Sequence, residues 1–255
     1  MSPETAWFLL VPVAWLSMWL VEHRWPARQY VPVRGWKWRG VAFFMLTAVV
    51  SSLIAAALKA AHLGTHPVLQ LSSLGYWGIP VGLLATSFVT YWWHRASHRF
   101  DVLWRFSHQL HHSARRIDIP GAFFAHPVEV AVKGTLAFVV ASVVLGLSHE
   151  AAAAVGACSA LISISLHWNV RTPHVLGVFM QRPEMHCLHH EYGEHRRNYG
   201  DLPIWDLLFG TFENPRSEDV AGIRFGFDDE RSARIADMLL MRDVNREPAP
   251  PLTVG

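Results

Sequence analysis

Long apolar stretches dominate the first two thirds of the chain. Three of them, residues 5–21, 41–58 and 76–93, each approach the roughly 20 residues that an α-helix needs to cross a hydrocarbon core of about 30 Å. A fourth, residues 128–166, is long enough for two passes, and its break at residues 146–150 predicts the tip of a helical hairpin. We therefore expect an all-α, polytopic membrane bundle with about five crossings, or with four and a partly inserted hairpin.

Basic residues predict which side of the membrane each loop faces, because cytoplasmic loops carry an excess of Lys and Arg. Five basic residues lie between the first two apolar stretches, whereas residues 61–75 carry no charged residue. Five arginines follow the third stretch, and ten more lie from Arg171 to Arg246. We therefore expect the N-terminus outside and the C-terminus in the cytoplasm.

The chain divides into three predicted parts. Residues 1–75 hold the N-terminal spans, residues 76–213 form a histidine-bearing catalytic region, and residues 214–255 form a polar cytoplasmic tail. The first span is not expected to be a cleaved signal peptide, because no basic residue precedes it and no small-residue cleavage site follows it. The tail ends in Pro248, Pro250 and Pro251, which predicts disorder in its last residues.

Composition agrees with a membrane protein. Hydrophobic residues make up 51% of the chain and charged residues only 16%. A net charge of +2 gives no basic surplus that would indicate nucleic-acid binding. Two cysteines, Cys158 and Cys187, argue against a disulfide framework or a thiolate metal site. The unusual feature is histidine, with sixteen copies.

Eight histidines follow spacings typical of metal ligands, and a ninth stands near them alone. One pair forms HxxxH, two triplets form HxxHH, and a single histidine follows the hairpin. Because residues at i, i+3 and i+4 share one face of a helix, we expect each triplet to present three imidazoles toward one point. All nine fall on the predicted cytoplasmic side. They are His94, His98, His108, His111, His112, His167, His186, His189 and His190.

The number of these histidines predicts two metal ions. A single zinc takes three or four protein ligands, so eight or nine imidazoles suit two metals with positions left for water or dioxygen. Neutral imidazole binds iron, zinc, copper and nickel alike, so the ligand type alone does not name the metal.

The sequence around the boxes resembles the fatty acid hydroxylase and sterol desaturase superfamily of membrane di-iron oxygenases. The matching segments are WWHRASH, FSHQLHHS, FAHPVEV, LHWNVRTP, RPEMHCLHH and NYGDLPIWDLLFGTF, which cover about residues 90 to 213. The resemblance implies a helical membrane protein whose cytoplasmic cap holds two irons. It also implies O2 as co-substrate and a lipid, such as a sterol or a fatty acyl chain, that is hydroxylated or desaturated.

The resemblance also assigns the ligands. Eight of the nine histidines match the family's ligand boxes, and His167 matches an additional histidine near the end of the last span. Some family members carry a further histidine four residues earlier, where this chain has Ser163. The chain carries no nucleotide-binding fingerprint. Electrons are therefore expected from a redox partner of ferredoxin or cytochrome type.

Several residues near the boxes are candidates for orienting the ligands. His126, in an HP motif with Glu129, is expected to orient a ligand or to pack against the cap. Asn169 and Asn198 are candidates for fixing an imidazole or a metal-bound water, with a turn or helix-end role as the alternative.

Asp201 and Asp206 are candidates for orienting an imidazole N–H, and Asp206 is the preferred one. A helix cap or an ion pair is the alternative role. We expect His195 to face solvent. Five other histidines lack ligand spacing and are excluded as ligands: His23, His62, His66, His149 and His174.

Two other functions remain open at this stage. A membrane zinc hydrolase would need a general base, and Glu191, beside His190, is the only nearby candidate since HExxH is absent. A non-catalytic haem-binding or metal-handling protein would place axial histidines within the spans, whereas these boxes lie outside them. We expect a multi-pass protein of the bacterial inner membrane, with its site facing the cytoplasm.

Overall fold

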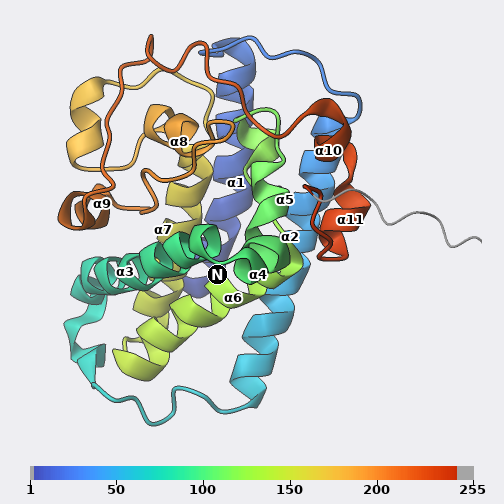
Figure 1. Cartoon of the computed structure of the whole chain (residues 1–255). Coiled ribbons are helices and arrows are strands. Elements are labelled where there is room, and N and C mark those ends of the chain that lie inside the picture. Colours follow the sequence, from blue (N-terminus) through green and yellow to red (C-terminus); the bar gives the residue numbers. More distant parts are fainter. Residues whose placement is uncertain (1–2, 246–255) are drawn as a thin grey trace, which may run out of the picture.

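The computed structural model describes residues 3–245 (Figure 1). These residues are almost entirely helical and contain no β-strand beyond an isolated bridge between Glu191 and Phe225. The predicted all-α class is therefore confirmed. The predicted disorder at Pro248, Pro250 and Pro251 lies outside the described residues.

Within residues 3–245, four helices are long and apolar enough to cross a membrane. They are α1 (Pro3–Arg24), α2 (Trp36–Ala60), α6 (Pro127–Phe138) with its π-helical continuation η4 (Val139–Val144), and α7 (His149–Leu166). Between 11% and 33% of the residues in each apolar stretch are buried inside the protein. Most of their side chains therefore lie outside the packed interior, as lipid contact requires.

The predicted hairpin joins η4 to α7 at Gly146. This residue has a φ of +60°, which glycine adopts without the steric penalty of a Cβ atom. A Cβ at this position would collide with the Leu69 carbonyl oxygen and the Pro67 ring. The loop before α3 lies here because the backbone N–H groups of Val68 and Leu69 donate to the carbonyls of Val143 and Val144.

Replacing Gly146 by alanine is expected to destabilise the fold by about 1–3 kcal/mol, because the strained φ and the collision act together. Gly156→Ala is the matched control, since Gly156 lies within α7 and a Cβ there would meet open space. The midpoint of thermal unfolding in detergent should fall for the first variant and stay constant or rise for the second. Equal midpoints would contradict the role of Gly146.

The third apolar stretch forms α3 (Gly78–Arg99), yet it is not among the four candidate spans. Glycine, serine, threonine and aromatic residues dilute its aliphatic positions. The helix packs against α7 near the hairpin tip and ends at the histidines. The expectation of about five crossings therefore stays a prediction.

Short elements build a cap at the end of the bundle where α1 and α7 finish. In chain order they are α4 (Asp101–Leu103), η2 (Trp104–His108), α5 (Gln109–His112), η3 (Ile119–Gly121), η5 (His174–Val178), α8 (Pro183–His189), α9 (Pro203–Phe209), α10 (Asp229–Ala233) and α11 (Ile235–Leu239). The remaining short element, η1 (Leu71–Trp77), lies before α3. The segment after residue 213 packs into this cap rather than trailing from it, because Phe227, Met238 and Val244 share a core with Leu110.

Buried carboxylates tie the cap to the bundle. Glu22, near the end of α1, accepts hydrogen bonds from the backbone N–H groups of Ile119 and Asn169. Asp118 accepts from the indole of Trp36 at 2.9 Å and pairs with Arg116 at 2.7 Å. These contacts fix the loops that carry the histidines relative to α1 and α2.

Candidate metal centre

The nine candidate histidines converge into two adjoining groups. Their ring nitrogens lie within 4.8 Å of one another inside each group. The five-histidine group contains His94, His98, His108, His112 and His189, and the four-histidine group contains His111, His167, His186 and His190. His167, His186 and His190 of the four-histidine group are buried, whereas His94 and His98 of the other group are half-buried.

Each HxxHH box serves both groups, which corrects the expectation that its three imidazoles meet at one point. His108 and His112 join the five-histidine group, while His111 between them joins the other. The second box does the reverse, because His186 and His190 join the four-histidine group and His189 joins the first. Residues at i and i+4 lie nearly above each other on a helix, whereas i+3 points to the other side of that line, so one box can bridge two centres.

Three imidazoles are oriented by partners at Nδ1. His94 donates to the Tyr199 carbonyl at 2.7 Å and His189 donates to the Arg197 carbonyl at 2.7 Å. His108 donates to the buried carboxylate of Glu129 at 2.9 Å. Because these acceptors require a proton on Nδ1, the Nε2 atoms of all three rings carry lone pairs directed into the group.

The contacts between Nε2 atoms test whether a cation fits. His94 and His108 bring their Nε2 atoms to 3.0 Å, and His98 and His189 bring theirs to 3.2 Å. Since His94 and His108 each donate from Nδ1, two Nε2 lone pairs face each other when both rings are neutral, an arrangement that a shared metal ion would stabilise. Nitrogens bound to one metal at about 2.1 Å and at right angles would lie about 3.0 Å apart. The donor set therefore fits a metal ion.

The four-histidine group also brings pairs of Nε2 atoms close together. Nε2 of His186 lies 3.0 Å from Nε2 of His167, and Nε2 of His190 lies 3.1 Å from Nε2 of His111. The Nδ1 atoms of His111, His167 and His190 are buried without a hydrogen-bond partner in the described structure. Neutral imidazoles with no better partner at Nε2 than one another are donors suited to a transition metal.

Burial keeps these imidazoles in the neutral form that binds metal. It lowers the pKa of His111 and His190 well below 6.5 and that of His167 to about 3, with neighbouring histidines adding to the shift in His111 and His190.

Acidification is expected to destabilise the metal-free protein. A folded-state pKa below the unfolded value means that the unfolded chain binds more protons, so stability falls as the pH drops through about 6.5. Thermal unfolding of metal-free protein in detergent should show a lower midpoint at pH 5.5 than at pH 8. A double variant, His186→Asn with His190→Asn, should show a smaller difference, and an unchanged difference would contradict this assignment.

The candidate orienting residues lie one layer further out. His126 accepts a hydrogen bond from the Val128 N–H at the start of α6, and its Nε2 lies 3.2 Å from the Leu239 carbonyl. The second contact packs His126 against α11 of the cap. Asn198 bonds the backbone of Met185 and Glu213. Within the described residues neither side chain has a hydrogen bond to a histidine of the two groups, so ligand orientation by them stays a prediction.

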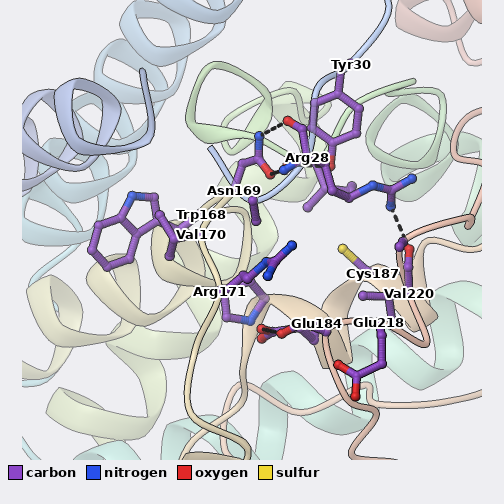
Figure 2. Close-up of a pocket in the computed structure, with 15 residues that line it drawn as sticks. Arg28, Tyr30, Trp168, Asn169, Val170, Arg171, Glu184, Cys187, Glu218 and Val220 are labelled. Atoms are coloured by element: carbon purple, nitrogen blue, oxygen red, sulfur yellow. Dashed lines mark hydrogen bonds between the residues drawn. The ribbon is translucent and has the colours of Figure 1, made fainter. Parts of the chain in front are cut away.

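Asn169 lies beside a separate cavity of about 220 Å³ next to α8. Figure 2 shows its side chain facing Arg28, whose backbone N–H and carbonyl it binds at 3.0 and 2.9 Å. Cys187 and Glu184 also line this cavity, but none of the nine histidines does.

Asp206 acts on the five-histidine group through the backbone. It is fully buried and accepts hydrogen bonds from the N–H groups of Tyr199 and Gly200 and from the Thr211 hydroxyl. This fixes the Tyr199 carbonyl that binds His94. Asp201 instead lies 3.3 Å from the Thr90 hydroxyl.

Sequence reasoning was wrong about His195 and gave Glu129 no separate role. His195 is half-buried rather than solvent-facing, because its ring packs on Trp104 and on His112, with a centroid separation of 4.5 Å for the latter pair. Glu129, in the HPVE segment, supplies the one carboxylate bonded to a grouped histidine within the described residues.

Comparison with known proteins adds independent information. Residues 79–211 match the family model for fatty acid hydroxylases. The chain is 35% identical over 142 residues to ornithine lipid hydroxylase OlsE of Rhizobium tropici, covering 54% of this chain and 42% of that protein. It is 30% identical over 135 residues to the sphingolipid C4-hydroxylase sur2 of Schizosaccharomyces pombe, covering 50% and 45%.

A human protein is also similar. Alkylglycerol monooxygenase is 28% identical over 150 residues, which cover 55% of this chain and 32% of that protein. The chain thus spans less than half the length of these three relatives. No solved structure gives a significant match.

Proposed function

Because this chain belongs to the fatty acid hydroxylase family, we propose that it is a membrane-bound di-iron enzyme that uses O2 to hydroxylate or desaturate a lipid. The observation that carries the proposal is the sorting of nine histidines into groups of five and four. Two adjoining imidazole groups suit two metal ions, and the relatives are lipid hydroxylases and monooxygenases.

The nine histidines would hold the two irons, one in each group. A bound di-iron centre supplies the reductive activation of O2 and the oxidation of an unactivated C–H bond. For hydroxylation the balance is one lipid C–H, one O2, two electrons and two protons, giving one alcohol and one water. The two electrons would come from a ferredoxin or cytochrome type of donor.

The protein's own residues position the metals and the substrate. Glu129 and the carbonyls of Tyr199 and Arg197 hold three imidazoles with their Nε2 atoms inward. His94 and His98 are both half-buried and belong to the same group, so we place the approach of O2 and lipid on their side.

The substrate is proposed to be a membrane lipid with a polar head group that enters from the bilayer. Ornithine lipid, sphingolipid and alkylglycerol, named for the three relatives, share this character. The site would face the cytoplasm of a bacterial inner membrane, in line with the distribution of basic residues. We do not propose the hydrolase, because Glu191 pairs with Arg197 at 3.9 Å and Glu129 is bonded to His108.

The proposal is tested by metal content and oxygen uptake. Protein purified anaerobically in detergent and reconstituted with iron is given a chemical or ferredoxin-type reductant and total membrane lipid. About two irons per chain and lipid-stimulated oxygen uptake are expected, and mass analysis of the lipid would identify the product. Zinc binding alone, with no uptake after iron reconstitution, would reject the oxygenase.

A further inference from the structure

Exposed apolar side chains continue beyond the four candidate spans. On α3, Val81, Leu84, Phe88 and Trp92 lie three or four residues apart and therefore share one face, and each is about 40% exposed. On α9, Ile204, Leu207 and Leu208 repeat this spacing, and Leu208 is 65% exposed. On and just after η5, the exposed apolar side chains include Val175, Val178 and Phe179.

The opposite face of α9 is fixed to α3. The Trp205 indole donates to the Ser87 hydroxyl at 2.9 Å and packs on Phe88, and Phe209 packs on Trp92. Asp206, the only charged residue of α9, is fully buried. These contacts fix the orientation of α9, so that Ile204, Leu207 and Leu208 stay on its outer face. This outer face carries no charged residue.

The three apolar faces lie on elements that contact one another. The helix α3 packs against α7, a candidate span, and Phe88 and Trp92 of its stripe contact aromatic rings of α9. η5 contacts α9 and is held to the chain near residue 214 by hydrogen bonds between His174 and Asn214 in both directions. Figure 1 shows α9 beside α3, at the border between the long helices and the cap.

Basic side chains border this surface. The Arg95 guanidinium lies 5.5 Å from the ring centre of Trp92, and Arg171 is exposed just before η5. Aromatic side chains with flanking arginines are typical of the membrane interface, where the rings reach the acyl boundary and the guanidinium groups meet phosphates.

We propose that the outer faces of α9 and η5 lie in the head-group and acyl boundary of the bilayer, as interfacial segments beside α3. The partner is the lipid of the membrane that the four candidate spans would cross, because α3 packs against one of these spans and carries exposed apolar side chains toward α9. This inference rests on membrane embedding and goes beyond the lipid chemistry proposed above.

The placement connects the membrane surface to the metal centre. Asp206 of α9 holds the Tyr199 and Gly200 backbone, and the Tyr199 carbonyl holds His94. The position of α9 is thereby coupled to the orientation of His94 in the five-histidine group.

The test measures the depth of nitroxide labels on the full chain in nanodiscs of phosphatidylcholine and phosphatidylglycerol. Labels are placed at Leu208→Cys and, on a separate element, at Phe179→Cys, both in a Cys158→Ala background. Cys187 is not expected to react, because burial raises the pKa of its thiol to about 12. Leu16→Cys on α1 is the lipid-exposed reference and Glu218→Cys on the cap is the water-exposed reference.

Collisions with lipid-soluble oxygen are expected to exceed those with a water-soluble nickel chelate at Leu208 and Phe179, as at Leu16, with the opposite sign at Glu218. Nickel dominating at both positions would overturn the proposal. Exclusion of both reagents would also overturn it, because a second copy or another protein would then cover the surface. The measurement needs neither metal nor turnover, so it is independent of the proposed function. A variant whose size-exclusion elution differs from that of wild type is replaced by Leu207→Cys.

Discussion

Replacing His190 by alanine is expected to reduce iron from about two per chain to about one, and to lower lipid-dependent oxygen uptake by at least about 100-fold. His190 belongs to the buried four-histidine group, in which its Nε2 lies 3.1 Å from that of His111. Its loss leaves three imidazoles there. Changes to residues that only orient ligands already cost 10–100-fold in metal affinity or activity, so removal of a ligand should cost more.

Two variants make this expectation specific. His98→Ala removes one of five ligands, so four remain, and this variant is expected to retain more iron than His190→Ala under the same iron concentration. His174→Ala serves as the control, because His174 is exposed and bonded to the Asn214 carbonyl outside both groups. Two irons and near-normal uptake in His190→Ala would reject two separate metal groups.

The change Glu129→Gln is expected to weaken iron binding in the five-histidine group about 10–100-fold. Glutamine keeps an oxygen that can accept from His108 Nδ1, but it removes the buried negative charge that makes this imidazole a stronger donor to a cation. It also leaves the Lys133 ammonium, 3.7 Å from the carboxylate, without its partner.

Competition with an iron chelator measures this affinity apart from turnover. Glu218→Gln is the control, because Glu218 is exposed on the cap. Iron affinity equal to wild type in Glu129→Gln, together with a lower unfolding midpoint, would show that Glu129 only stabilises the fold. The decrease in oxygen uptake should follow the loss of iron and recover at saturating iron.

The architecture and the candidate ligands could be inferred from sequence because both are carried by contiguous residues. An apolar run long enough for a span and the break at Gly146 are local, so the hairpin follows from them. Eight of the nine histidines were identified in the same way, since their spacings within single helical turns require no knowledge of the fold, whereas His167 was assigned by the family resemblance.

Only the tertiary structure decided which histidine belongs to which of the two groups. His111 lies between two residues of the other group because helices from distant parts of the chain approach each box from two sides. The sequence put His195 in a charged loop, and packing on Trp104 buried half of it.

The supports of the centre depend on contacts over longer distances. Every residue has a carbonyl, so nothing in the sequence marks those of Tyr199 and Arg197 as partners of His94 and His189. Glu129 reaches His108 across 21 positions of chain. The sequence by itself determined which residues are candidate metal ligands and that they gather at one end of a helical bundle, because spacing and hydropathy are local. Only the tertiary structure decided the sorting into two groups and the orientation of each ring, because both arise from contacts between segments far apart in the chain.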